Sequence, residues 1–171
     1  MITDSIRLFV LCALLTGCGL AQTVGDGAAS TANALLHKQL KTLELDFIAR
    51  ASLNTDTQDA RSLSASTVVR VYQLRRNDGV ERASYDSLLN DSAEVLNDDL
   101  LVEHSVLVRP GEAAQLSVAL HPQAQAIAVV GLFREPDAQD NSWRLVIARD
   151  ELLVDQARVI ELRENRLRLW M

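Results

Sequence analysis

Hydrophobic and polar residues alternate along much of this chain from residue 43 onwards, with the period of two that is typical of strands with one buried face. In Leu43–Ala49 the apolar positions alternate with the acidic residues Glu44 and Asp46. The segment 67–74 adds β-branched residues, which favour strands. The continuous apolar run 126–133 indicates a strand that is buried on both faces. Further expected strands are 103–108, 114–120, 143–148, 157–162 and 167–170.

Turn residues separate these segments, and short strands with frequent turns are typical of a β-sandwich. Gly79 is expected to end the strand 67–74 by adopting a positive φ. Pro110 and Gly111 fit a type II turn, at either a hairpin or a sheet-to-sheet corner. Asn165 is expected in the left-handed conformation of a tight turn. The sequence therefore predicts an all-β sandwich of about eight strands.

One stretch has helical spacing instead. Between residues 84 and 100 the large apolar side chains recur at intervals of three and four, which predicts a short helical insertion. Ser84 is the expected N-cap of the first helix, and Asp91 or Ser92 is expected to begin a second one.

The N-terminus carries an apolar run, Leu8–Leu15, that follows Arg7. A membrane-spanning helix needs about 20 apolar residues, so this run fits the hydrophobic region of a signal peptide. The alternative is a buried apolar segment with an incidental cysteine. The sequence Leu15-Thr16-Gly17-Cys18 resembles the lipobox of bacterial lipoproteins, in which the cysteine is lipidated. Gly19 follows that cysteine, and in enterobacterial lipoproteins the absence of Asp there implies the outer membrane.

The lipobox divides the chain into three parts. Residues 1–17 are the expected signal peptide, residues 18–40 the lipidated N-terminus and a tether rich in small and polar residues, and residues 41–171 the sandwich with its helical insertion around 84–100. The tether is expected to be flexible, with an ordered helix near its end as the alternative.

Composition and cysteine usage narrow the classes of function. The formal net charge is −6 without a basic stripe, which argues against a nucleic-acid partner. Of the two cysteines, Cys12 would leave with the signal peptide and Cys18 would carry lipid, so no disulfide is expected. His37, His104 and His121 lack the spacing of metal ligands, and no phosphate loop or nucleophile elbow is present. We therefore expect no catalytic residues, no metal and no cofactor.

A long polar loop is predicted between the first two strands, from Leu53 to Ser66. Loops of about a dozen residues are uncommon inside compact domains and are usually functional or disordered. Leu53 and Leu63 are its expected apolar anchors for a partner, and its charged residues would steer encounter. The candidate contact residues are Leu53, Asn54, Thr55, Asp56, Thr57, Gln58, Asp59, Arg61, Ser62 and Leu63.

Taken in order, these features resemble the TssJ (VasD, SciN) lipoproteins of type VI secretion systems. The most specific part of the resemblance is the block Val69-Arg70-Val71-Tyr72-Gln73-Leu74. It lies among a lipobox, a tether, a polar loop that begins near Asn54, a helical insertion rich in Asp and Leu, the Pro110-Gly111 corner and the strand that begins with Trp143-Arg144.

The resemblance implies a transthyretin-like β-sandwich that is anchored to the inner leaflet of the outer membrane and faces the periplasm. It also implies that the loop 54–66 binds the periplasmic C-terminal domain of TssM, which works with TssL in the inner membrane. Such a protein is a structural component without an enzymatic activity or a small-molecule substrate. The alternative function is a carrier of a small apolar ligand, with an internal pocket lined by Val129 and Leu132. A periplasmic enzyme would need His104 or His121 beside carboxylates.

Overall fold

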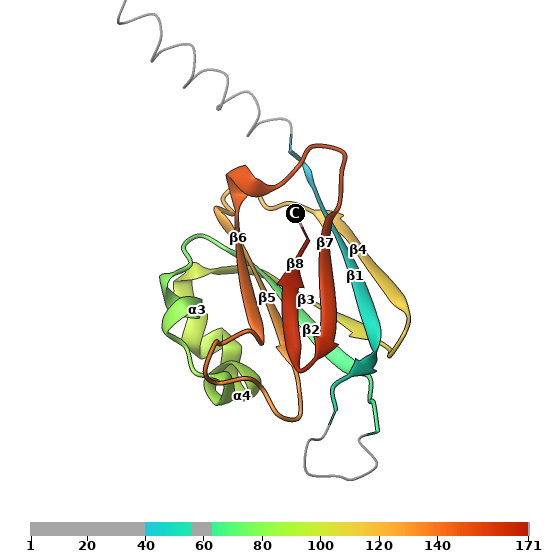
Figure 1. Ribbon diagram of the computed structural model, residues 1–171. Coiled ribbons are helices and arrows are strands. Elements are labelled where there is room, and N and C mark those ends of the chain that lie inside the picture. Colours follow the sequence, from blue (N-terminus) through green and yellow to red (C-terminus); the bar gives the residue numbers. More distant parts are fainter. Residues whose placement is uncertain (1–39, 56–62, 171) are drawn as a thin grey trace, which may run out of the picture. The chain divides into compact units, whose positions relative to one another are not determined.

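The computed structural model describes residues 40–55 and 63–170, which belong to one compact unit. Within these ranges two four-stranded sheets pack face to face, with the strand orders β4-β1-β7-β8 and β3-β2-β5-β6. Figure 1 shows their arrangement, and the predicted all-β class is confirmed. The strands are β1 Thr42–Leu53, β2 Thr67–Leu74, β3 Leu100–Val108, β4 Ala113–Ala119, β5 Ala126–Leu132, β6 Arg144–Ala148, β7 Arg158–Glu164 and β8 Arg166–Leu169.

Strand β1 lies inside the first sheet, antiparallel to β4 and parallel to β7. Its alternation is as predicted, because Leu43, Leu45 and Phe47 are buried while Glu44 and Asp46 lie on the outer face. The strand continues beyond the predicted end, as far as Leu53. It therefore runs directly into the long loop that precedes β2.

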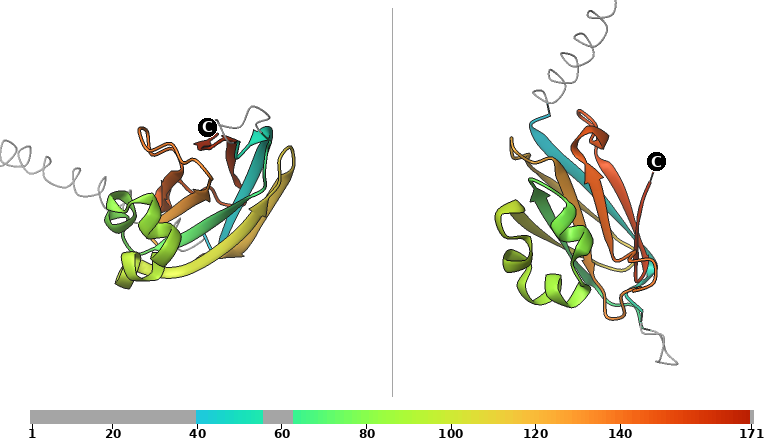
Figure 2. Two further views of the ribbon diagram at one scale, coloured as in Figure 1. Left: turned by 90° about the horizontal axis from the view of Figure 1, so that it is seen from below. Right: turned by 90° about the vertical axis from the view of Figure 1, so that its left-hand side faces the viewer.

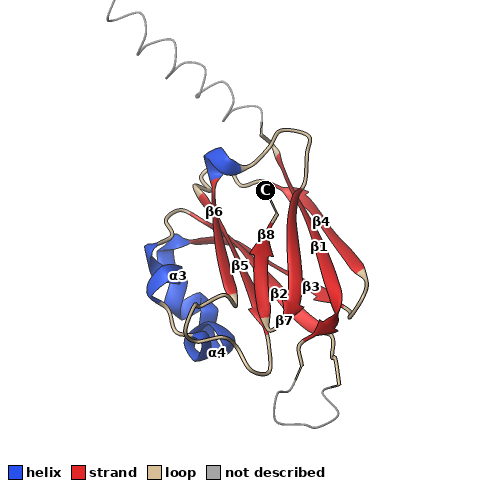
Figure 3. Ribbon diagram, in the orientation of Figure 1, coloured by secondary structure: helices blue, strands red, loops and turns tan. Residues whose placement is uncertain are grey.

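The second sheet is covered by the first sheet on one face and by the helical insertion on the other. Strand β5 lies between β2 and β6, and it is buried along almost its whole length, as its apolar sequence predicts. The helical insertion consists of α3 Asp78–Arg82, α4 Tyr85–Leu96 and the 3₁₀ turn Asn97–Asp99. Figures 2 and 3 show these helices together on the side of the second sheet that faces away from the first.

The predicted helix starts are confirmed. The Ser84 hydroxyl accepts a hydrogen bond from the backbone N–H of Ser87 at 3.2 Å, as an N-cap does. Asp91 has non-helical angles (φ −149°, ψ 65°), and its carboxylate accepts from the N–H of Glu94 at 3.2 Å. A second helical segment therefore begins at Asp91, behind a kink in α4.

Side chains attach this insertion to the second sheet. The guanidinium of Arg144 donates to three carbonyls of α3 and its end: Val80 and Ala83 at 2.7 Å each, and Glu81 at 2.6 Å. The hydroxyl of Tyr85 donates to the carbonyl of Phe133 at 2.6 Å. Its ring also packs edge-on against the buried Trp143, with 5.2 Å between centroids.

One turn prediction is confirmed and two are wrong. Gly111 has φ 74°, and Glu112 N donates to the carbonyl of Arg109 at 3.1 Å, as in a type II turn. This turn joins β3 to β4, which belong to different sheets, so it is a corner. Gly79 lies in α3 and has no positive φ, because the chain enters a helix there.

In the β7–β8 turn, Glu164 rather than Asn165 has the positive φ, at 55°. The side chain of Asn165 is used elsewhere, since its Nδ2 donates to the carbonyl of Thr55 at 3.0 Å. The tight turn thus forms where it was predicted, with the left-handed residue one position earlier.

Candidate functional site

The described ends of the loop between β1 and β2 lie at one end of the sandwich, together with two other connections. Figure 1 shows the β5–β6 loop and the β7–β8 turn at the same, lower end of the molecule. The structure describes loop residues 54–55 and 63–66. The candidates Asp56, Thr57, Gln58, Asp59, Arg61 and Ser62 lie outside the described residues.

Asn54 fixes the start of the loop. It has φ 51°, a left-handed conformation that Asn tolerates better than most residues. Its Nδ2 donates to the carbonyl of Ser66 at 3.2 Å, and its Oδ1 accepts from the backbone N–H of Arg134 at 2.8 Å. Its own backbone N–H donates to the carbonyl of Glu164. One side chain and one N–H thus join the start of the loop to its own last residue, Ser66, to the β5–β6 loop and to the β7–β8 turn.

Further hydrogen bonds hold the two described ends of the loop. Ala65 N donates to the carbonyl of Leu53 at 3.0 Å, which closes the loop across its base. Asn165 Nδ2 donates to the carbonyl of Thr55 on the other side. We refer to the described residues 53–55 and 63–66 as the loop base. Because its residues are bonded to each other across the base and also to the β5–β6 loop and the β7–β8 turn, the loop base is a fixed platform.

The two leucines predicted as apolar anchors have different environments. Leu63 is exposed, with 67% of its surface accessible, whereas Leu53 is completely buried. Leu53 ends β1 with its side chain in the core, so its expected role as an exposed anchor is corrected. Asn54 is also buried, at 4% exposure, and it shapes the loop base with its side chain. Of the described candidates, Leu63 is the apolar side chain available to a partner.

The β5–β6 loop beside the loop base is itself ordered by Asp137. Its carboxylate accepts from the backbone N–H of Gln139 at 3.0 Å and from the Ser142 hydroxyl at 3.2 Å. It also forms an ion pair with Arg166 at 3.0 Å. These donors, with the backbone N–H of Gln139 as the largest contribution, hold the pKa of Asp137 below its ordinary value. Sequence reasoning missed this neighbouring loop because only the tertiary fold brings it to the loop base.

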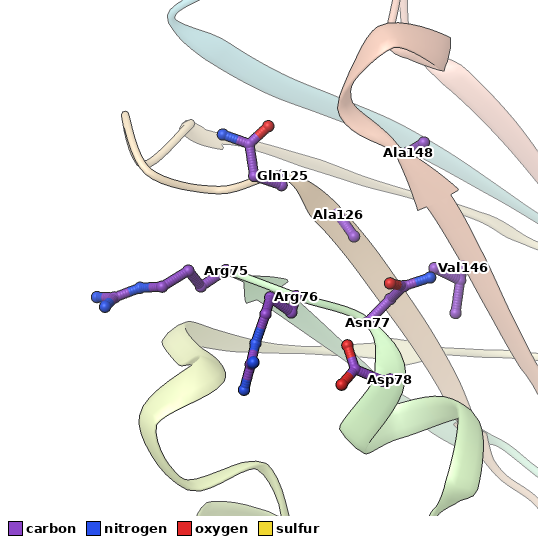
Figure 4. A pocket seen from close by; sticks show the side chains of 8 residues that line it. All are labelled: Arg75, Arg76, Asn77, Asp78, Gln125, Ala126, Val146 and Ala148. Atoms are coloured by element: carbon purple, nitrogen blue, oxygen red, sulfur yellow. The ribbon is translucent and has the colours of Figure 1, made fainter.

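A shallow pocket of about 280 Å³ lies at the other end of β2, away from the loop base. Figure 4 shows the side chains that line it: Arg75, Arg76, Asn77, Asp78, Gln125, Ala126, Val146 and Ala148. The guanidinium of Arg76 is engaged by Asp99, with N–O distances of 3.0 and 3.1 Å, and this carboxylate raises the pKa of Arg76. No Ser, Thr, Cys, Lys or His side chain is among the residues that line this pocket.

The residues predicted for a ligand carrier or an enzyme, Val129, Leu132, His104 and His121, lie apart from the pocket of Figure 4. Val129 is fully buried in the core between the sheets, and the pocket of Figure 4 involves neither Val129 nor Leu132. His104 lies on β3, and His121 caps a turn by accepting from the N–H of Gln123. Within residues 40–55 and 63–170, no group of three or more His, Cys, Asp or Glu side chains could hold a metal ion.

None of the helices among the described residues has the length and apolar composition that crossing a membrane requires. The fold and the loop base define a small β-sandwich whose candidate site is an anchored connecting loop. Residues 41–165 match the family model described as type VI secretion lipoprotein, VasD, EvfM, TssJ. The chain therefore belongs to the type VI secretion lipoprotein family, as the sequence features predicted. This is a family of structural lipoproteins and not a known enzyme family.

Solved structures agree with this assignment. A chain of the structure titled "Type VI membrane complex" is 38% identical, with a TM-score of 0.72, and the match covers 78% of this chain and 100% of that one. A chain of the structure titled "T6SS protein TssM C-terminal domain (869-1107) from EAEC" is 36% identical, with a TM-score of 0.69 and coverages of 77% and 98%. Serratia marcescens Lip, described as a membrane bound component of the type VI secretion system, shares the fold at 21% identity, with a TM-score of 0.67 and coverages of 77% and 98%. No curated protein matched.

Proposed function

We propose that this chain is an outer-membrane lipoprotein of a type VI secretion membrane complex. In this proposal Cys18 carries the lipid and the sandwich faces the periplasm. The loop between β1 and β2 binds the periplasmic C-terminal domain of TssM, which works with TssL in the inner membrane. The chain thereby anchors the complex to the outer membrane.

Similarity to two secretion-system structures supports this role. The matched chains are 36% and 38% identical, and their structures are titled for the TssM C-terminal domain and for a type VI membrane complex. Lipidation rests on the lipobox at Cys18. Each buried methylene of a lipid chain contributes about 0.8 kcal/mol to membrane binding, so several chains on one cysteine would hold the domain stably.

The single structural observation that carries the proposal is the loop base. An exposed Leu63 projects from a backbone segment that is hydrogen-bonded to the sandwich at both of its described ends. A preorganised segment loses less conformational entropy on binding than a free one. A few side chains near the centre of a contact usually carry most of its binding energy. In this proposal Leu63 is the central apolar contact, while Asp56, Asp59 and Arg61 steer encounter and orientation.

Recruitment of TssM to membranes tests the lipidation of Cys18 and the binding of TssM together. The TssM periplasmic domain should co-sediment with outer membranes that contain the wild-type protein, and Cys18→Ser should abolish this co-sedimentation by releasing the sandwich from the membrane. Cys12→Ser is the matched control, because this cysteine lies in the expected signal peptide, and it should recruit TssM normally. Normal outer-membrane fractionation of Cys18→Ser would refute lipidation at this residue.

A further inference from the structure

A turn in the connection between β6 and β7 exposes two adjacent aliphatic side chains. Leu153 and Val154 are 40% and 42% accessible. Leu153 pairs with Gln156 in an isolated antiparallel bridge, so Val154 and Asp155 form a two-residue turn, in which Asp155 has φ 57°. Turns favour Gly, Pro, Asn, Asp and Ser, and Asp155 follows this rule whereas Leu153 and Val154 do not. We refer to Leu153–Gln156 as the apolar turn.

The apolar turn lies at the end of the sandwich where the described chain begins. Arg149, which opens the connection, donates to the carbonyl of Leu40 at 3.5 Å and to that of Ala124 at 2.7 Å. The carbonyl of Arg149 accepts from the N–H of Leu152 at 3.2 Å. Figure 1 shows the β6–β7 connection at the same, upper end as the start of β1, opposite the loop base. Arg149 thus links the connection to the residue at which the N-terminal part of the chain joins the domain.

A covalent link would keep a membrane within reach of this end. In the proposed function Cys18 carries lipid, and residues 19–39 connect it to Leu40. A segment of this length spans at most about 75 Å when fully extended. The link replaces a bimolecular encounter by an intramolecular one, so a contact that is too weak to hold a free partner can still form with the membrane.

The size of the apolar turn favours a membrane over a protein as its occupant. A stable protein interface buries about 800 Å² on each partner, and two partly exposed side chains supply only a small part of that area. Insertion into the interfacial region of a bilayer needs no such area, because its strength simply grows with the apolar surface that is buried. Exposed charges near the turn are mostly acidic: Asp150, Glu151 and Asp155, against Lys41. Attraction to anionic headgroups therefore does not account for the contact.

We propose that the apolar turn inserts into the surface of the membrane to which the chain is anchored. Leu153 and Val154 enter the interfacial region, while the carboxylate of Asp155 stays hydrated among the headgroups. This inference rests on the lipidation of Cys18 in the proposed function. Because the loop base lies at the opposite end of β1, the contact directs the loop base away from the membrane and toward its partner.

Quenching by lipids in vesicles tests this proposal on the lipidated chain. After removal of the expected signal peptide Cys18 is the only cysteine, so Gln156→Cys provides a single site for a fluorophore and keeps Leu153 and Val154 in place. Phosphatidylcholine that carries a nitroxide below its headgroup should quench this fluorophore. The matched control is a fluorophore at Leu107→Cys, an exposed leucine of β3, which should not be quenched.

A double variant identifies the side chains that make the contact. Leu153→Ser, Val154→Ser, combined with Gln156→Cys, should lose the quenching, and its thermal unfolding should match that of the parent. Quenching at residue 156 that is no stronger than at residue 107, or that persists in the double variant, would overturn the proposal. A requirement for anionic phosphatidylglycerol would also overturn it, because headgroup charge would then hold the turn.

Flotation of the protein with the vesicles separates this proposal from the lipid anchor. A wild-type chain that does not float lacks the anchor, which would refute the proposed lipidation and the inserted turn together. A chain that floats without quenching at residue 156 would refute the inserted turn alone. A fluorescence change that appears only when the TssM domain is added would assign the apolar turn to that partner instead of the membrane.

Discussion

At the scale of single residues, Asn54 determines the shape of the loop base. Its amide group joins Ser66 and Arg134, and its backbone holds φ 51°. It is buried, so a substitution would leave the N–H of Arg134 without its acceptor. The cost of such an unsatisfied buried group is about 1–3 kcal/mol.

We therefore expect Asn54→Ala to lower the free energy of unfolding by about 1–3 kcal/mol in a denaturant titration. Asn54→Gly loses the same hydrogen bonds but accepts the positive φ without strain, and it should be less destabilised than Asn54→Ala. Wild-type stability of Asn54→Ala would show that these hydrogen bonds do not hold the loop base.

Asn54 also shows what a local sequence pattern cannot predict. A polar Asn at the start of a loop was expected to contact a partner, whereas its side chain bonds to segments 12 and 80 residues away. Leu53 is a similar case, since the end of a strand and the start of a loop are indistinguishable by local polarity. Only the pairing of β1 with β7 places both residues inside the fold.

At the scale of elements, the alternating pattern predicted the strands because burial on one face of a sheet is a local property of the sequence. Ser84 and Asp91 likewise marked helix starts, since an N-cap acts within three residues. The additional helix α3 was missed, because its position depends on Arg144 in a distant strand. Its guanidinium binds three carbonyls of this region and stacks over the Trp143 ring, 4.8 Å from the ring centroid.

Replacing Arg144 should therefore loosen the helical insertion. We expect Arg144→Met to destabilise the protein by about 1–3 kcal/mol, since hydrogen bonds that involve a charged group contribute about this much. Amide exchange should accelerate first in α3 and the start of α4. The matched control is Arg82→Met, whose exposed ion pair with Asp78 at 3.4 Å should contribute little. Unchanged exchange in α3 would contradict this role of Arg144.

At the scale of the whole molecule, β1 connects the start of the described domain, at Leu40, to the loop base. The described chain enters at Leu40, whose carbonyl accepts from the buried Arg149 at 3.5 Å. It then runs through the twelve residues of β1 to the loop base. At about 3.3 Å per residue, a strand of this length spans roughly 40 Å. Leu40 and the loop base are thus separated by the length of one strand inside a sheet.

The central claim is that the loop between β1 and β2 binds TssM, and a calorimetric titration tests it most directly. The TssM periplasmic domain should bind the wild-type chain and should show no measurable binding to a variant in which residues 56–63, Leu63 included, are replaced by a Gly-Ser linker of equal length. The hydrogen bonds of the loop base, which involve residues 53–55, 65 and 66, stay intact in this variant, so its thermal unfolding should match that of the wild type. Undiminished affinity in a folded variant would contradict the account.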